Sequence, residues 1–301
     1  MKIAFSTISC PAYTAEQMCR AAAEYGYDAV ELYALEGDRL TVPVIEARLE
    51  ELRRTFREAG VTLCSLNSWG QFSMADPAAR EAMERQVIRA LELAAELDCP
   101  QVKTFGGALP KEVPAETVFA YVAEHIGRIA RRGEALGVRL LLETHDGFSP
   151  SGHVRAILDG VPSAAFAALW DVHHPFRMGE TPEQVDATIG ARVAHLHVKD
   201  CVRAGGSGAA GIVGGTSGAA PGAEAWDYVL LGQGELAPHV RQAMALMARR
   251  GFDGYVSVDW EKQWHPEIAE PEVSLPHFAR VLREYAAVAP TVPVVATGGG
   301  S

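Results

Sequence analysis

A weak internal repeat constrains the fold of this chain more than any other feature of its sequence. In each repeat an amphipathic segment ends in glycine, and a short run rich in β-branched residues follows one or two residues later. The repeat is found at AAAEYGYDAVEL, RTFREAGVTLCSL, RRGEALGVRLLLE and MARRGFDGYVSVDW. Glycine suits the left-handed position just past a helix end, because the lack of a Cβ removes the steric penalty there. The repeat therefore predicts helices that each lead directly into a strand.

Extended apolar runs predict a series of strands that alternate with helices. The strands are expected at Lys2–Phe5, Ala29–Leu32, Thr62–Leu66, Gln101–Thr104, Arg139–Leu142, Ala168–Asp171, Val193–His197 and Tyr255–Val258. Helical segments between them include Ile45–Ala59, Pro77–Leu97, Ala115–Leu136 and Pro238–Arg249. Eight strands alternating with helices indicate an α/β protein with a (β/α)8 TIM barrel. A doubly wound sheet is disfavoured, because its G-x-G-x-x-G turn is absent and the first turn reads STISCPAYT.

Two segments interrupt the rhythm of strands and helices. Residues 203–225 and 288–301 are rich in Gly, Ala, Ser and Pro, and such segments bury too little side-chain area to offset the entropy of ordering. We interpret residues 1–287 as one barrel with a loop insertion at 203–225, and residues 288–301 as a disordered tail. The insertion follows the seventh strand, so it is either a mobile lid over the mouth of the barrel or a low-complexity loop without a role.

Charge and composition exclude several classes of partner. The chain has 301 residues and a formal net charge of −11, and without a cluster of Lys and Arg it lacks the positive charge that binding to nucleic acid requires. Its apolar runs are shorter than the roughly 18 residues of a membrane-spanning helix, and the start, MKIAFSTISCPAYT, lacks the features of a secretory signal. The 5 cysteines are scattered, as in a reducing compartment. We expect a cytoplasmic protein without a membrane or nucleic-acid partner, and a homo-oligomer is left open.

Acidic and histidine side chains gather where the predicted strands end. The residues are Glu31, Asn67, Glu143, His145, Asp171, His173, His174, His195, His197, Lys199, Asp200, Asp259, Glu261 and Lys262. Functional side chains of barrels come from these carboxyl ends. A single such residue is usually a cap or a surface ion pair, but six of the eight strands carry them here. Converging carboxylates need positive charge among them, and one imidazole with several carboxylate oxygens suits Mn²⁺ or Mg²⁺, with Co²⁺ or Zn²⁺ possible.

The expected metal ligands are Glu143, Asp171, His197 and one acid of the eighth strand. Alternate residues of a strand face the same side, so both histidines of HLH could point inward. His197 lies nearer the end of its strand and is the expected ligand. His195 is expected to pack inside the barrel or to orient a ligand from behind.

Five motifs in order give the chain a family resemblance. They are LLLETH, LWDVHHPFRMGETPE, HLHVKD, LGQGEL and GFDGYVSVDWEKQWHPE. With them the chain resembles, over roughly residues 1–285, the sugar phosphate isomerase/epimerase family of xylose isomerase-like TIM barrels. That family includes ketose 3-epimerases, inosose dehydratase and dehydroshikimate dehydratase. The resemblance implies a Glu-Asp-His-Glu metal site at Glu143, Asp171, His197 and a fourth position. Family members commonly read E-W-E at this place, where this chain has Asp259-Trp260-Glu261. Asp259 stands at the position of the first Glu and is therefore the favoured fourth ligand, with Glu261 as the alternative.

The resemblance implies a metal-dependent isomerase or epimerase of small polyhydroxy carbonyl compounds, with Mn²⁺ as the first choice of metal. A divalent ion stabilises an enediolate, while one carboxylate removes the α-proton and a second returns it. In the epimerases of the family, two metal-bound glutamates resemble such a pair of carboxylates. Here the resemblance implies Glu143 together with Asp259 or Glu261. His174 and Lys199 would orient substrate hydroxyls or stabilise negative charge. The other expected substrate-binding residues are His145, Asn67, Trp69, Glu31, Arg203 and Trp260.

Three other functions are weighed against this one. A dehydratase would share the metal site and the first step, and would then expel a β-hydroxyl as water. A non-catalytic sugar-binding barrel would not need so many acids. An apurinic endonuclease is disfavoured, because Asn67, Trp69, Lys103 and Phe105 stand near the positions of its additional histidines and because the chain is acidic. Whether the substrate is phosphorylated stays open, with candidate cations at Lys103, Arg177, Lys199, Arg203 and Lys262.

Overall fold

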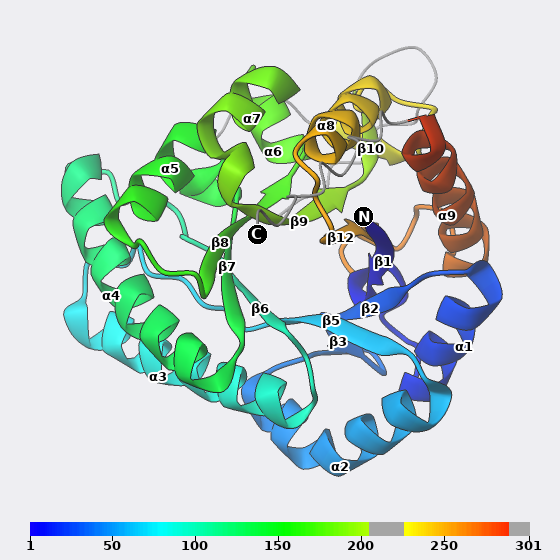
Figure 1. Ribbon diagram of the computed structural model, residues 1–301, viewed down its shortest axis with the longest axis horizontal. Coiled ribbons are helices and arrows are strands. Elements are labelled where there is room, and N and C mark those ends of the chain that lie inside the picture. Colours follow the sequence, from blue (N-terminus) through cyan, green and yellow to red (C-terminus); the bar gives the residue numbers. More distant parts are fainter. Residues whose placement is uncertain (205–225, 289–301) are drawn as a thin grey trace, which may run out of the picture.

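The computed structural model describes residues 1–204 and 226–288. In this part of the chain, parallel strands form a closed barrel in the order β1-β12-β9-β8-β7-β6-β5-β2, ringed by helices (Figure 1). The barrel strands are β1 (Lys2–Ser6), β2 (Ala29–Leu32), β5 (Thr62–Asn67), β6 (Gln101–Thr104), β7 (Arg139–Glu143), β8 (Phe166–Asp171), β9 (Val193–Val198) and β12 (Tyr255–Val258). The predicted TIM barrel is therefore confirmed.

The helices pack around the outside of the barrel. They are α1 (Ala15–Tyr25), α2 (Val42–Ala59), α3 (Pro77–Glu96), α4 (Ala115–Leu136), α5 (Ser151–Gly160), α6 (His173–Arg177), α7 (Pro182–Ile189), α8 (Ala237–Arg249) and α9 (Pro271–Val288). Gly26, Gly60 and Gly137 follow α1, α2 and α4 with φ of 76°, 65° and 69°, and Gly251 after α8 has φ 73°. These are the left-handed conformations that the repeat predicted, and they turn each helix toward its next strand.

The inside of the barrel changes from apolar to polar along its axis. Near the strand beginnings the small buried side chains of Ala4, Ala29 and Cys64 pack with Tyr255. Toward the strand ends, buried charged and polar side chains replace them. Side chains alternate between the two faces of a strand. A residue that points into the barrel near the beginning of a strand is therefore followed, two positions later, by another that points inward nearer the end of the strand. The polar end of the barrel is therefore positioned by an apolar layer beneath it.

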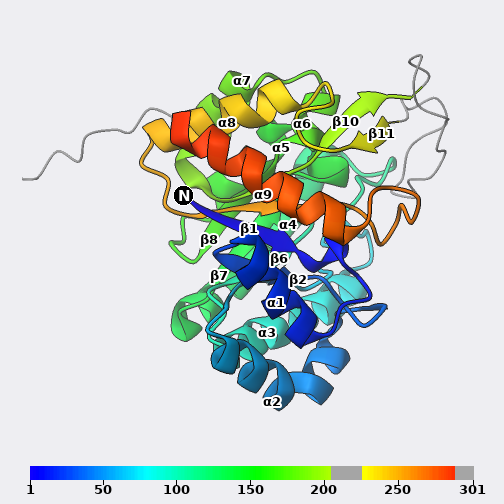
Figure 2. The ribbon, with the colours of Figure 1, turned by 90° about the vertical axis from the view of Figure 1, so that its right-hand side faces the viewer.

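Two short hairpins follow barrel strands, and the strand pattern did not predict either. The first joins β3 (Ala34–Leu35) to β4 (Asp38–Arg39), and the second joins β10 (Asp200–Arg203) to β11 (Trp226–Val229). Figure 2 shows β10 and β11 at the side of the molecule toward which β1 runs, so this hairpin stands at the carboxyl end of the barrel.

The two predicted irregular segments lie largely outside the described residues. Arg203 ends β10 and Ala204 follows it, whereas residues 205–225 of the predicted lid or loop are not described. Val288 ends α9, and the rest of the predicted tail is likewise outside the described part. No helix within residues 1–204 and 226–288 is long and apolar enough to cross a membrane. The cysteines are all buried and free.

Candidate active site

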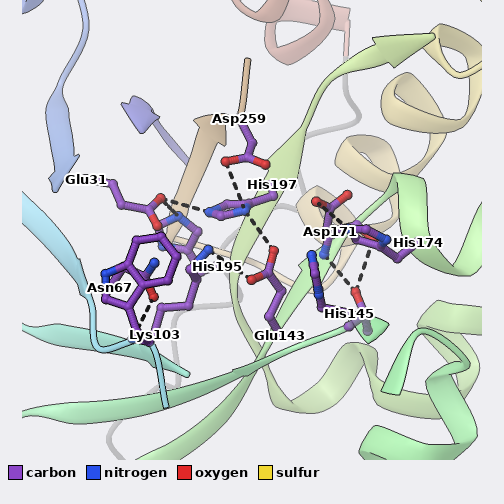
Figure 3. Close-up of polar contacts among 12 residues, drawn as sticks. Glu31, Asn67, Lys103, Glu143, His145, Asp171, His174, His195, His197 and Asp259 are labelled. Atoms are coloured by element: carbon purple, nitrogen blue, oxygen red, sulfur yellow. Dashed lines mark hydrogen bonds and ion pairs between the residues drawn. The ribbon is translucent and has the colours of Figure 1, made fainter. Parts of the chain in front are cut away.

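Four candidate metal ligands meet at the carboxyl end of the barrel (Figure 3). Asp171, His197 and Asp259 each offer one ligand atom, and these atoms lie within 4.8 Å of one another. His197 Nδ1 is also 3.2 Å from Glu143 Oε1 and 3.7 Å from Asp259 Oδ1. Strand pairing explains why these residues lie together. β9 pairs with both β8 and β12, which sets His197 beside Asp171 on one side and beside Ser257, two residues before Asp259, on the other.

Two of these ligand atoms are buried without a hydrogen-bond partner. They are His197 Nδ1 and Asp259 Oδ1, whereas Asp171 Oδ2 forms an ion pair with Lys199. A buried polar atom without a hydrogen bond costs about 1–3 kcal/mol, so two such atoms side by side indicate that something else completes the site. One imidazole nitrogen with carboxylate oxygens is a donor set for a divalent cation. The residues therefore fit the metal that the sequence predicted.

Glu31 and His195 support His197 from behind. Glu31 Oε2 lies 2.8 Å from His197 Nε2 and 3.4 Å from His195 Nε2, and Gln101 Oε1 lies 3.0 Å from His195 Nδ1. Burial raises the pKa of Glu31, but the two histidines outweigh burial and hold it well below its ordinary value. An ionised carboxylate can only accept, so His197 Nε2 donates to Glu31. Burial lowers the pKa of His197, but Glu31, Asp259 and Glu143 outweigh burial and raise it to about 10. Its Nδ1, 3.2 Å from Glu143 Oε1, therefore carries a proton near pH 7 that a bound cation would replace.

Two buried lysines neutralise the carboxylates. Lys103 Nζ is 2.9 Å from Glu143 Oε2, and it lies over the rings of Tyr33 and Phe105, 5.0 and 4.7 Å from their centroids. Burial lowers the pKa of Lys103, but Glu143 and other acids outweigh burial and raise it above its ordinary value. Burial raises the pKa of Glu143, but Lys103 and His197 bring it below its ordinary value. This pair is therefore fully charged inside the barrel.

Lys199 contacts three acids at once. Its Nζ donates to Asp259 Oδ2 and Glu261 Oε1, each at 2.8 Å, and it is also 2.8 Å from Asp171 Oδ2. Burial raises the pKa of Asp259, but Lys199 and His197 outweigh burial and lower it. Glu261 Oε1 also accepts from the hydroxyl of Tyr228 at 2.9 Å. Lys199, predicted to bind substrate, thus contacts the protein's own carboxylates, and Asp259 rather than Glu261 lies in the candidate metal cluster with Asp171 and His197.

Two histidines line the pocket on the side of β7 and β8. The rings of His145 and His174 are 4.4 Å apart. His174 Nε2 is 3.6 Å from Asp171 Oδ2, and His145 Nδ1 is 3.1 Å from Asp146 Oδ2. Burial and the neighbouring cations lower the pKa of His174 well below its ordinary value, so its ring is neutral near pH 7. Both predicted substrate-binding histidines therefore face the cavity.

A cavity of about 410 Å³ lies above the acids. Its walls carry aromatic side chains from several loops, namely Tyr33, Trp69, Phe105, Tyr228 and Trp264. Trp69 is in the left-handed region at φ 58°, and hydrogen bonds from its backbone N–H to Asn67 Oδ1 and from its indole to Leu40 O hold it there. A cavity of this size lies within the roughly 300–1,000 Å³ range of small-molecule sites.

Four predicted substrate-binding residues do not face this cavity. Glu31 is buried behind His197, and buried Asn67 accepts from Trp69. Trp260 points to the opposite side of the chain from Asp259, where its indole donates to Ala269 O. Arg203 stands on the outer hairpin with its side chain 59% exposed and Nε 3.9 Å from Glu235. These four side chains thus lie away from the cavity in which the sequence analysis expected them, because the sequence alone does not tell residues that face the cavity from residues that support them.

The sequence analysis also missed residues of the cavity wall. Tyr33 follows the second strand at the inward position after Glu31, so the same alternation could have identified it. Arg39 follows the turn at Glu36 and Gly37, which have φ of 52° and 90°. A two-residue turn of this kind is a hairpin signal, but Glu-Gly is a weak one. Tyr228 gave no local signal, because its place depends on the pairing of β11 with β10.

Comparisons with known proteins agree with this architecture. Residues 19–288 match the sequence profile of a family described as xylose isomerase-like TIM barrels. Among curated proteins, none is significantly similar in sequence.

Solved structures with the same fold are distant in sequence. 3-Keto-D-glucoside 4-epimerase YcjR from E. coli, in its apo form, is 14% identical with a TM-score of 0.71, covering 94% of this chain and 99% of its own. The IOLI protein with a bound zinc atom is 15% identical with a TM-score of 0.76, covering 97% and 100%. A probable 3-DHS dehydratase, AsbF from Bacillus anthracis, is 17% identical with a TM-score of 0.70, covering 94% and 99%. At such identities the likeness shows the fold alone.

Proposed function

The chain belongs to the xylose isomerase-like TIM barrel family, and from this premise we propose that it is a divalent-metal-dependent isomerase or epimerase. Its substrate is a small polyhydroxy carbonyl compound, such as a keto-sugar, and the reaction begins with removal of the proton next to the carbonyl. The epimerases among the structural relatives support this reaction class.

One observation carries the proposal. His197 Nδ1 and Asp259 Oδ1 are buried without hydrogen-bond partners, a ligand atom of Asp171 lies within 4.8 Å of ligand atoms of both residues, and Glu143 is beside them. We assign these four residues as ligands of the metal, with Mn²⁺ as the first ion to test. When bound, a divalent cation acts as a Lewis acid that polarises a carbonyl group and makes the neighbouring C–H more acidic.

The chain's own residues supply the proton transfer. Glu143 is ionised by its contacts with Lys103 and His197, so its carboxylate can accept the α-proton. Asp259 lies on the other side of His197 from Glu143 (Figure 3). From there its carboxylate can take a proton from the ammonium of Lys199, which donates to Asp259 Oδ2 at 2.8 Å, and pass it to the opposite face of the same carbon, which inverts that centre. Lys103 and Lys199 keep the surrounding acids neutralised, so the negative charge that develops on the substrate is not repelled.

Metal content and isotope exchange test this proposal together. We expect purified protein to hold near-stoichiometric divalent metal that His197→Ala loses and that His239→Ala on α8 retains. Incubation of the manganese-loaded protein with a panel of ketoses in D₂O is expected to place deuterium on carbon in at least one ketose. Protein that binds no divalent metal under any condition would overturn the proposal.

A second candidate is a dehydratase, and the contact between Tyr228 and Glu261 favours it. The Tyr228 hydroxyl lies beside the cavity and donates to Glu261 Oε1. Lys199 Nζ, 2.8 Å from the same oxygen, would stabilise the phenolate that remains after Tyr228 gives up its proton. After the α-proton passes to Glu143, the C–O bond of a β-hydroxyl would break, and the leaving oxygen would take a proton from Tyr228 to depart as water. Formation of a conjugated carbonyl, followed by its ultraviolet absorbance, separates this outcome from epimerisation.

A further inference from the structure

Arg39 lies at the mouth of the cavity in contact with two tryptophans. Its guanidinium carbon is 4.5 Å from the centroid of the Trp264 ring and 5.0 Å from that of Trp69, and all three residues line the cavity. A guanidinium that rests on aromatic rings uses its flat face, so its N–H groups remain available in the plane. The two rings therefore hold a hydrogen-bond donor with a fixed charge at the entrance.

The hairpin that carries Arg39 is firmly attached to the barrel. Ala34, the partner of Arg39 in the hairpin, bonds Thr7 Oγ1 through both its N–H and its carbonyl. At the turn, Gly37 N–H donates to Pro11 O. The indole of Trp69 donates to Leu40 O, next to Arg39. The exposed arginine is thus supported by a rigid backbone and by a tryptophan that the same hairpin orients.

Arg39 has no acidic partner within the described residues, unlike most cations of this region. Lys103 pairs with Glu143, and Lys199 pairs with the acids of β8 and β12. Lys262 donates to Glu270 and to two backbone carbonyls. In residues 1–204 and 226–288 the side chain of Arg39 forms neither an ion pair nor a hydrogen bond, and the same is true of the side chain of Arg177, which also lines the cavity.

Arg39 and Arg177 approach the cavity from facing walls. Arg39 follows β2 and Arg177 follows β8, and these strands lie four places apart in either direction around the ring. The acids at the floor of the cavity are Glu143, Asp171 and Asp259, and their charges are neutralised by Lys103 and Lys199. The chain as a whole has a net charge of −11, which repels anions. A fixed cation at the mouth therefore gives an anionic molecule a favourable place to bind.

We propose that the substrate carries an anionic group, a carboxylate or a phosphate, and that Arg39 binds this group while the acids of the floor act on the other end. The inference rests on the proposed function for its account of the floor, but binding of the anion does not require turnover. Guanidinium binds either group through two parallel hydrogen bonds. Arg177, on the facing wall, is the second donor available to the same molecule.

Equilibrium binding to the manganese-loaded protein tests the inference. The probes are fructose 6-phosphate and glucuronate, compared with neutral fructose and glucose, followed by calorimetry and by the fluorescence of Trp69 and Trp264 beside Arg39. We expect at least one acidic probe to bind about tenfold or more tightly than its neutral parent, which corresponds to about 1.4 kcal/mol. Which acid binds more tightly decides between phosphate and carboxylate.

Substitutions test whether Arg39 causes the preference for acidic over neutral probes. Arg39→Gln is expected to abolish it, and Arg39→Lys to retain only part of it, because an ammonium keeps the charge but lacks the two-pronged geometry. Arg20→Gln, an exposed arginine on α1, removes the same charge elsewhere and should leave the preference unchanged. Equal binding of acidic and neutral probes, failure of both acids to bind, or a preference that survives in Arg39→Gln would each overturn the inference.

Isotope exchange distinguishes this inference from the proposed function. The protein could bind acidic probes selectively, in a way that depends on Arg39, and yet exchange no C–H proton. That result would support the anion site and overturn the proposed reaction. Exchange on neutral ketoses that is indifferent to Arg39→Gln would overturn the anion site and leave the proposed reaction standing.

Discussion

Two clusters of charged residues, one inside the barrel and one between its outer helices, satisfy their polar atoms in different ways. Between α3 and α4, Glu84 accepts from Arg128 at 2.8 and 3.0 Å and contacts His125 Nδ1 at 2.6 Å. Arg80 donates to His125 Nε2 and to the carbonyls of Met74 and Ala75. Inside the barrel, His197 Nδ1 and Asp259 Oδ1 have no hydrogen-bond partner.

This difference separates a structural cluster from a binding site. The polar atoms of Arg80, Glu84, His125 and Arg128 that are buried all have partners, so this helix interface is complete as it stands. The barrel cluster bears the cost of unpaired buried atoms, which a fold retains where a ligand completes them. Substitutions in the two clusters should therefore affect different properties.

The largest effect is expected from Glu143→Gln. The substitution keeps the size of the side chain but removes the base, so turnover should fall by about a thousandfold or more while the protein stays folded. The measurement is the rate of C–H exchange, with circular dichroism as the check on folding. Glu24→Gln on α1 is the matched control. Full activity in metal-loaded Glu143→Gln would remove this residue from the reaction.

Removal of metal comes next. A ligand that binds only the folded state stabilises it by about 2.7 kcal/mol at roughly 100 times its dissociation constant, so chelation should lower the melting temperature. The measurement is thermal unfolding with and without manganese. The shift should vanish in His197→Ala and persist in Glu84→Gln. A shift of equal size in His197→Ala would place the metal elsewhere.

Glu84→Gln tests the complete cluster. It removes the negative charge and one of the two acceptor oxygens shared by Arg128 and His125, in a site where the Glu84 side chain is 14% exposed. We expect the free energy of unfolding to fall by about 1–2 kcal/mol, less than for a fully buried pair because solvent reaches Arg128. Denaturant unfolding measures this loss. Metal content should not change, and a loss of metal in Glu84→Gln would contradict the separation of the two clusters.

The smallest effect is a dependence of stability on pH. Burial raises the pKa of Glu84, but Arg128 and His125 outweigh burial and lower it below 4.5. The unfolded chain then binds more protons, so this contribution is present above pH 4.5 and is lost as pH falls through the lowered pKa. Wild type and Glu84→Gln should therefore converge in stability at acid pH. A gap between them that stays constant or widens as pH falls would contradict this assignment.

Much of the fold could be predicted because its signals are local. The glycines after α1, α2 and α4 and the apolar runs that follow them each depend on a few neighbouring residues. Alternation along strands also placed Glu143, Asp171, His197 and Asp259 at one end of the barrel. The pairing of Glu31 with His197 could not be predicted, since it crosses the barrel between residues 166 positions apart. The place of Arg39 likewise depends on rings contributed by distant loops.

The seam between β1 and β12 has a consequence for how the site comes into being. Lys2 pairs with Tyr255 and Phe5 with Val258, so the ring closes between its first and last strands. Glu31 stands on β2 and His197 on β9, on opposite sides of that seam, so their contact at 2.8 Å forms only when the seam closes. Until then the sheet has two open edges that can pair with other chains. Closure of the ring therefore brings Glu31 to His197 and determines which nitrogen of that imidazole faces the other acids.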